Sequence, residues 1–259
     1  FFGRQTRPLN KLLEYSADFY IPGVTGSPNG AIEFLENLGI KYKSGTSIRK
    51  IFDLSEDEMK ILVKGIIKKR KDEKNPKDIF GEIYTLKTED KGSPLRDARE
   101  FSTLLNSCGR LGKSSLGIGV CLNDKKCKEK ATELMKTYKK ELISSIRWFE
   151  SNKEKGEKVH FGDNYLIVDA EENIMPTLTG TIASMLSHSA DLKKVDYIIV
   201  MSHNVDSTTK VSMRYSGKED GIDLRLILKN AIDSLGSGET GGHSGAAGAV
   251  IDSEKEKDF

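Results

Sequence analysis

The chain has 259 residues, 37% of them hydrophobic and 31% charged, which is enough for one large domain or two smaller ones with packed cores. Its 41 basic and 39 acidic residues nearly cancel, so the formal net charge of +2 does not by itself indicate a polyanionic partner. Three cysteines make a poor disulfide framework and predict a cytoplasmic protein, and no stretch approaches the roughly 20 apolar residues of a membrane span.

The first 40 residues predict a loop followed by a short helix. Proline and glycine punctuate the loop, and Asn29 is positioned as the N-cap of a helix over residues 31–38. Gly39 is the predicted stop, since glycine readily takes the left-handed conformation that ends helices. The chain begins without a methionine, and we expect it to continue a longer protein.

Residues 41–95 contain the most basic part of the chain. A Ser-Glu-Asp-Glu capping box at 55–58 predicts a helix that runs to about Arg70. The basic run 68–71 either complements the helix dipole on a solvated face or forms part of a protein-binding surface. A short strand-like run follows before a Gly-Ser-Pro break, and it contains Phe80, Ile83 and Leu86.

Residues 96–150 predict two helices separated by a flexible glycine-rich stretch. The first spans 96–105 and is followed by Asn106 to Arg110. The second, from about Lys125 to Glu150, is the clearest helix in the sequence, because its apolar residues recur at helical spacing and Asp124 is placed to cap it.

The last third of the chain alternates between strand and helix patterns after a charged linker at 151–158. We expect strands at 165–168, 197–201 and 209–215, helices at 177–186 and 223–235, and a glycine-rich loop over 236–248. This alternation predicts a small mixed-sheet α/β domain, joined by the long helix to an N-terminal helical region.

The glycine-rich loop is the first candidate binding element. Gly241 and Gly242 allow the backbone to approach a ligand closely and to present N–H groups to an anion. His243 can donate to a phosphate or sugar oxygen. The alternative is a flexible loop with an exposed histidine, which composition alone favours.

The strand 209–215 is the second candidate. Alternation places Lys210, Ser212 and Arg214 on one face and apolar residues on the other. Two cations and a hydroxyl in a line suit a chain of phosphates. An edge strand with a solvated face has the same pattern.

Asn106 and Arg110 are the third candidate, since an amide and a guanidinium near a helix end can hold a phosphate. The nearby Gly-Lys-Ser at 112–114 imitates a phosphate-binding P-loop, but Ser107 stands where that motif requires glycine, so a P-loop is excluded. No catalytic residue and no metal site is predicted in this chain, because the histidines outside the glycine-rich loop are isolated in sequence: His160, His188 and His203.

Three motifs in order resemble one known family. The sequence Gly-Gly-His-x-x-Ala-Ala-Gly at 241–248 resembles the signature of the DHH-associated C-terminal domain of RecJ exonucleases, oligoribonucleases and related phosphodiesterases. The Ser-Met-Arg at 212–214 stands where that family has a Ser-x-Arg strand. Residues 105–111 resemble the RecJ Asn-Ala-Ala-Gly-Arg motif, which precedes a bridging helix.

The sequences 2–9 and 20–26 are similar to an archaeal RecJ-like group, the GINS-associated nucleases. In that group this stretch follows the metal-binding DHH lobe. The resemblance therefore implies four parts: a segment after the missing lobe at 1–40, an insertion domain at 41–95, the motif segment with the bridging helix at 96–150, and a nucleic-acid-binding domain at 151–259.

The Asp-rich and Asp-His-His motifs of the family are absent from this chain. In the family they hold two divalent metals, Mn²⁺ or Mg²⁺, which activate water for phosphodiester cleavage. The resemblance implies that this chain is a fragment or one subunit of a split enzyme. It is then expected to hold no metal and to be inactive without the DHH lobe, in the same or a separate chain.

The resemblance also implies a role for each candidate. Gly241, Gly242 and His243 hold the terminal nucleotide of single-stranded DNA or RNA. Arg214, with Ser212 and Lys210 on its strand, binds a neighbouring phosphate, and Arg110 and Asn106 face the metal lobe. Two alternatives stay open, a replisome scaffold that binds the GINS complex through residues 41–95 and a part of an oligonucleotide phosphodiesterase.

Overall fold

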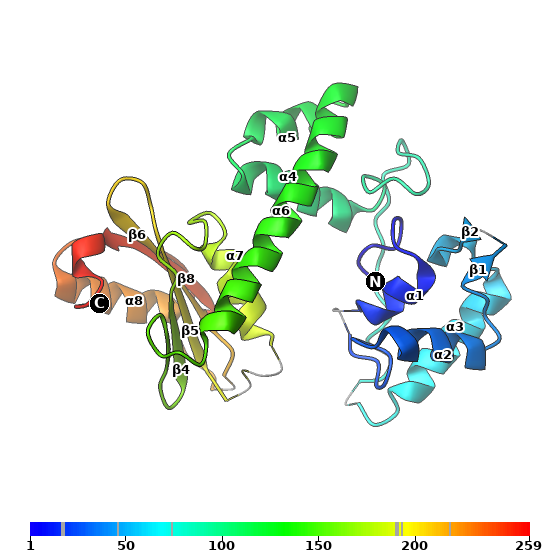
Figure 1. The fold of residues 1–259 in the computed structure, drawn as a ribbon, viewed down its shortest axis with the longest axis horizontal. Helices are drawn as coiled ribbons and strands as arrows, with labels where there is room; N and C mark the ends of the chain where they lie inside the picture. The colour runs from blue at the N-terminus through cyan, green and yellow to red at the C-terminus, as the bar shows by residue number, and fades with distance from the viewer. Residues whose placement is uncertain (17–18, 46, 74, 190–191, 193, 218) are drawn as a thin grey trace. The chain divides into compact units, whose positions relative to one another are not determined.

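The computed structural model describes residues 1–259 except 17–18, 46, 74, 190–191, 193 and 218 (Figure 1). The chain divides into two compact units, an N-terminal unit of residues 1–106 and a C-terminal unit of residues 107–259. The fold is mixed α/β, as the sequence predicts, with a six-stranded mixed sheet in the C-terminal unit. Among the described residues, no helix is both long enough and apolar enough to cross a membrane.

The N-terminal unit is built from helices around one apolar core. Its elements are α1 (Leu9–Glu14), α2 (Pro28–Asn37), a two-stranded hairpin of β1 (Lys43–Ser44) and β2 (Ser47–Ile48), the 3₁₀ helix η1 (Ile51–Asp53) and α3 (Glu56–Lys69). Helix α2 begins earlier than predicted, because Ser27 and not Asn29 is its N-cap: the Ser27 hydroxyl accepts the N–H of Gly30 at 3.0 Å. Gly39, at φ +70°, ends the helix as predicted.

The predicted capping box of α3 is confirmed. The N–H of Ser55 donates to Glu58 Oε2 at 2.9 Å, and the N–H of Glu58 donates back to the Ser55 hydroxyl at 3.2 Å. Arg49 also donates to both carboxylate oxygens of Glu58, at 2.8 and 2.7 Å, and this pairing lowers the pKa of Glu58 to about 2. The start of α3 is thereby fixed, and Leu62 and Ile66 pack into one core with α1 and α2.

The predicted strand near residue 80 is wrong. Phe80 and Ile83 lie in an irregular extended segment and are 61% and 59% exposed. The one bridge there joins Thr85 to Asp97. A short apolar run forms a strand only where a second strand supplies hydrogen bonds, and no described strand lies beside this segment.

Three helices follow: α4 (Ala98–Arg110), α5 (Ser114–Cys121) and α6 (Lys125–Asn152). The predicted break after residue 105 is wrong, since Asn106 and Arg110 lie inside α4. The predicted flexible stretch instead contains α5, whose Gly119 sits so close to α6 that a Cβ would lie 2.3 Å from Cys127 Sγ. The start of α6 is as predicted, with Asp124 accepting the N–H of Cys127 at 2.7 Å.

The C-terminal unit has a sheet with strand order β3-β4-β5-β6-β8-β7, in which β4 and β5 are parallel and the other neighbours antiparallel. Its strands are β3 (Val159–Phe161), β4 (Tyr165–Asp169), β5 (Tyr197–His203), β6 (Thr208–Tyr215), β7 (Glu239–His243) and β8 (Ala246–Asp252). The predicted loop over 236–248 is therefore wrong. Gly241 and Gly242 lie in β7, Gly245 lies in the turn that follows, and Gly248 lies in β8.

Helices cover the two faces of this sheet unequally (Figure 1). Helices α6 and α7 (Thr179–Ser187) pack on one face, where α7 lies over β5 and β6 and α6 shares a core with β4 and β5. Helix α8 (Leu224–Leu235) packs on the opposite face, over β8 and β7. On the α7 side the sheet continues past that helix, where Ala246 and Gly248 are half-buried and Gly241 and His243 are exposed.

Candidate anion-binding site

The strand register brings two predicted residues, Arg214 and His243, into one row. Arg214 pairs with Ala246 across β6 and β8, and Ala246 pairs with His243 across β8 and β7. Directly paired residues share a face of the sheet, so Arg214 and His243 lie on the same face, two strand spacings or roughly 10 Å apart. Only the methyl group of Ala246 stands between them.

The next row on this face is Ser212, Gly248 and Gly241. Two of its three members have no side chain, so the sheet backbone itself is accessible there. We call the α7-side surface formed by Ala246, Gly248, Gly241 and His243 the glycine shelf. Arg214 and Ser212 on β6 form its border.

The two neighbouring glycines of β7 are needed for different reasons. Gly242 has φ +139°, and a Cβ on it would lie 2.4 Å from the carbonyl oxygen of Ala246, so the hairpin requires glycine at this position. Gly241 has no such constraint, because a Cβ on it would meet no atom within 4 Å. The absence of a side chain at Gly241 therefore leaves space above the shelf.

Two arginines lie near the border of the shelf without a carboxylate partner among the described residues. Arg214 donates to the carbonyl oxygens of Met213 at 2.8 Å and Gly180 at 3.1 Å, and Arg110 donates to that of Thr177 at 2.7 Å. Burial, and then the charge of Arg110, lower the pKa of Arg214. Arginine stays protonated in proteins, so two like charges here favour an anion between them.

The start of α7 adds to this positive potential. Its N-cap, Leu178, provides no side-chain hydrogen bond to the first turn, and a helix N-terminus carries partial positive charge. A Cβ on Gly180 would lie 3.2 Å from Arg214 Nη2 and 3.4 Å from the Ser212 hydroxyl. The small residue thus lets both side chains pack against the first turn of α7.

The remaining predicted residues, Lys210 and Asn106, do not belong to the rows that form the shelf. Lys210 is half-buried on the same face as Arg214 and Ser212, as the alternation predicts. The edge-strand alternative is wrong, because β6 lies between β5 and β8. Asn106 is exposed on α4, one turn before Arg110, and belongs to the N-terminal unit.

His203 is isolated in the sequence but not in the structure, and the prediction that this chain holds no metal stays a prediction. Asp169, His203 and Glu256 each offer a ligand atom within 4.8 Å of the others. These residues end β4, end β5 and follow β8, so they are far apart in sequence. One feature of the sequence could have pointed to this group. The residues lie at or after the carboxyl ends of strands, and the carboxyl ends of parallel strands meet at one edge of a sheet. Three ligands suit one ion, not the two-ion centre that the resemblance implies for the catalytic lobe.

Both units match family models. Residues 1–81 match the DHH-CID domain and residues 162–259 match the DHHA1 domain. The chain therefore belongs to the DHH family and carries a DHHA1 domain. The glycine shelf and the strand with Arg214 both lie within the DHHA1 match.

One curated protein matches nearly the whole chain. An uncharacterized protein of Methanocaldococcus jannaschii is 28% identical over 252 residues, which cover 96% of this chain and 50% of the relative. The chain thus spans half the length of that relative.

Two solved structures are similar at lower identity. RecJ from Thermus thermophilus, in complex with Mn²⁺, is 17% identical, and the match covers 62% of this chain and 22% of RecJ with a TM-score of 0.46. CDC45 from Entamoeba histolytica is 10% identical, and the match covers 99% of this chain and 54% of CDC45 with a TM-score of 0.49. A second structure of Thermus thermophilus RecJ, in complex with Mg²⁺, is 16% identical over 62% of this chain.

Proposed function

We propose that the C-terminal unit binds single-stranded nucleic acid on the glycine shelf, as the substrate-binding part of a RecJ-like exonuclease in DNA replication or repair. The observation that carries this proposal is the row of Arg214, Ala246 and His243. It sets a guanidinium and an imidazole on two sides of a floor that has almost no side chains.

Each group on the shelf has a distinct role in this proposal. Arg214 and Arg110 neutralise a phosphate at the start of α7, and the exposed backbone of Gly241 lets the sugar–phosphate chain approach the sheet. His243 donates to the terminal phosphate or sugar at the far side. Contacts of these kinds position a strand without reading its bases, so binding is expected to be independent of sequence.

The chemistry of cleavage belongs to a DHH lobe whose motifs are not found in this chain. Mn²⁺ or Mg²⁺ in that lobe supplies the activated water. The residues described here bind the strand and hold its end, and they transfer no proton to the reacting phosphate.

Fluorescence anisotropy with labelled oligonucleotides tests the proposal. The chain should bind single-stranded DNA or RNA with a Kd in the range of about 10⁻⁶ to 10⁻⁴ M, more tightly than a duplex of equal length, and less tightly as salt rises. With Mn²⁺ present, the oligonucleotide should stay intact. Equal affinity for the duplex, or robust cleavage by a contamination-free preparation, would contradict the proposal.

We infer a second function, protein docking on the N-terminal unit, from a separate observation. Phe80, Ile83 and Tyr84 are 61%, 59% and 67% exposed in one short segment and line a pocket together with Phe1 and Phe19. A cluster of exposed apolar side chains on a chain this rich in charge is typical of a protein-binding surface. The family resemblance names the GINS complex as the partner to test.

The double variant Ile83→Ser/Tyr84→Ser should bind purified GINS at least tenfold more weakly than the wild type in isothermal titration calorimetry. Exposed aromatic and aliphatic anchors commonly carry most of the binding free energy at such interfaces. Deletion of residues 41–95 is a poor test, because it removes Leu62 and Ile66 from the core. Ile118→Ser, at a position 63% exposed on α5, is the matched control and should bind normally. Unchanged affinity of the double variant would exclude this surface.

A further inference from the structure

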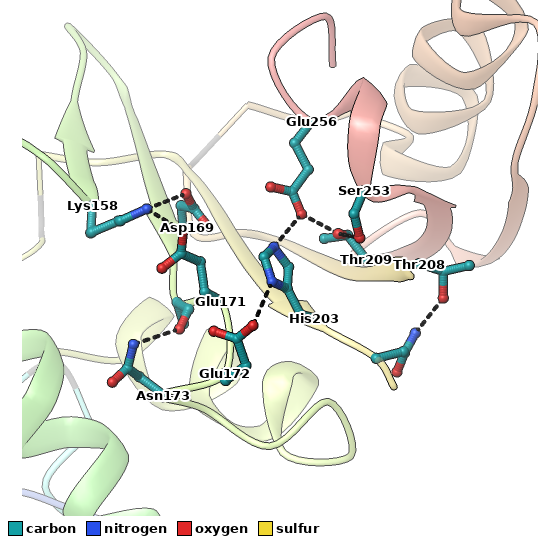
Figure 2. A network of polar contacts seen from close by, with 12 residues as sticks. Lys158, Asp169, Glu171, Glu172, Asn173, His203, Thr208, Thr209, Ser253 and Glu256 are labelled. Atoms are coloured by element: carbon teal, nitrogen blue, oxygen red, sulfur yellow. Dashed lines mark hydrogen bonds and ion pairs between the residues drawn. The ribbon is translucent and has the colours of Figure 1, made fainter. Parts of the chain in front are cut away.

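A second polar cluster lies at the other end of the same sheet (Figure 2). Asp169 is the last residue of β4, His203 is the last residue of β5, and Glu256 follows the 3₁₀ helix η3 (Ser253–Lys255) after β8. The hydroxyl of Thr209, near the start of β6, donates to Glu256. Arg214 lies five residues further along β6, which separates the cluster from the shelf border by roughly 17 Å.

Two buried atoms in this cluster have no hydrogen-bond partner. Four such side-chain atoms exist among the described residues, and Asp169 Oδ1 and His203 Nε2 are two of them. Both residues make contacts through their other polar atom. Lys158 lies 3.4 Å from the other oxygen of Asp169, and Glu172 lies 3.2 Å from the other ring nitrogen of His203. A buried polar atom without a partner is costly, so its position calls for a ligand.

The contact between His203 and Glu256 has the same implication. Glu256 Oε1 lies 2.8 Å from His203 Nε2, yet the two atoms do not have the geometry of a hydrogen bond. If the Nδ1 proton is donated to Glu172, the neutral ring turns the lone pair of Nε2 toward the cluster. A carboxylate oxygen and a nitrogen lone pair at this distance repel unless a proton or a metal cation binds both of them.

The charged groups around the imidazole carry an excess of negative charge, which also favours a bound cation. Figure 2 shows the carboxylates of Asp169, Glu172 and Glu256 around the His203 ring, with that of Glu171 close by. Lys158 is their lysine partner, at 3.4 Å from Asp169 and 2.5 Å from Glu171. Four carboxylates and one lysine leave a formal charge of −3 when the imidazole is neutral.

We propose that Asp169, His203 and Glu256 bind one divalent transition-metal ion, with Zn²⁺ as the best chemical match. One imidazole and two carboxylates are a donor set that zinc accepts readily. Zinc bonds of about 2.0–2.1 Å place tetrahedral donors roughly 3.3–3.5 Å from one another. The donors here lie within 4.8 Å of one another, so small side-chain movements bring them to that spacing.

Glu172 is not a proposed ligand, but it contacts the second ring nitrogen of His203 and orients the imidazole. Histidines that bind metals almost always donate their second ring N–H to a carboxylate or carbonyl, which fixes the tautomer and turns the free nitrogen to the ion. The contact of Glu172 with His203 Nδ1 has this arrangement. The bound ion ties the C-terminal segment that carries Glu256 to the ends of β4 and β5, so its expected effect is on stability.

Calorimetric titration of the whole chain with Zn²⁺ tests the proposal. The experiment uses the Cys121→Ser/Cys127→Ser background, because free thiols on α5 and α6 also bind zinc. We expect one ion per chain and a Tm that rises with Zn²⁺ and returns with a chelator. His203→Gln should weaken binding at least tenfold and remove the rise in Tm. His160→Gln, which removes a histidine of β3, should keep both.

Several outcomes would overturn the proposal. The first is a lack of stoichiometric Zn²⁺ binding. The second is a Zn²⁺ affinity of His203→Gln equal to that of the Cys121→Ser/Cys127→Ser background. The third is an equal loss of Zn²⁺ affinity in His203→Gln and His160→Gln. A Tm that depends on pH but not on Zn²⁺ would instead indicate a protonated imidazole held by two carboxylates. If His203→Gln does not fold, Glu256→Gln gives the same readout. Since the shelf lies at the opposite end of the sheet, a failed oligonucleotide assay would leave this result standing.

Discussion

Gly241→Val is expected to abolish single-strand binding and to leave the C-terminal unit folded. A Cβ at this position meets no atom within 4 Å, and β-branched residues are favoured in strands, so valine can enter β7 without a clash. Its two methyl groups then occupy the shelf beside Ser212 and Gly248, where the sugar–phosphate chain is proposed to lie. These methyl groups block contact between the nucleic acid and the sheet backbone, and a small shift of the nucleic acid does not restore that contact.

The affinity should fall more than tenfold in fluorescence anisotropy, whereas the Tm should change little. Thr240→Val is the matched control, because Thr240 is the preceding residue of β7 and its side chain points to the opposite face of the sheet. This control should bind as the wild type does. A Gly241→Val variant with wild-type affinity would exclude the glycine shelf as the binding surface.

Arg214→Ala is expected to weaken single-strand binding about tenfold and to reduce its salt dependence. A guanidinium that neutralises one phosphate releases about one counterion, so the slope of log K against log salt should shrink by about 1. Arg214 also donates to Gly180, so the variant should lose about 1 kcal/mol of unfolding free energy as well. The salt slope separates the two effects, because lost stability alone does not change it.

Two further variants make this result specific. Arg214→Lys keeps the charge but loses the planar fork of donors, so its affinity should lie between those of the wild type and the alanine variant. Arg225→Ala removes an exposed arginine on α8, across the sheet from the shelf, and should change neither quantity. An unchanged slope in Arg214→Ala, or an equal change in Arg225→Ala, would show that Arg214 does not contact phosphate.

The sequence pattern correctly predicted those elements whose conformation is determined by their own residues. The long helix α6 with its Asp124 cap follows from apolar spacing and one carboxylate. The two faces of β6 follow from simple alternation, which correctly places Lys210, Ser212 and Arg214 together. Such features need no knowledge of what packs against them.

Features that depend on a partner element were missed. Gly241 and Gly242 indicate a loop when taken alone, and they lie in a strand because β8 supplies its hydrogen bonds. The glycines of α5 suggested flexibility, and one of them instead permits close packing against Cys127. The run from Phe80 to Leu86 is rich in strand-forming residues but has no neighbouring strand in the described part of the chain.

The group of Asp169, His203 and Glu256 could not be predicted for a related reason. Its members are separated by 34 and 53 positions of sequence (203 − 169 and 256 − 203) and meet only because β4 and β5 are adjacent and β8 returns to the same end of the sheet. By contrast, the row of Arg214 and His243 was anticipated from the family resemblance, although the hairpin that creates it was not.

Histidine side-chain NMR offers the sharpest test of binding on the glycine shelf. The chain has four histidines, and they lie on β3, at the end of α7, at the end of β5 and on β7. Titration with a short single-stranded oligonucleotide should shift the imidazole signals of His243, assigned with His243→Gln, in a saturable way. Those of His160, His188 and His203 should stay in place. Saturable binding that leaves the His243 signals unmoved would contradict the proposed site.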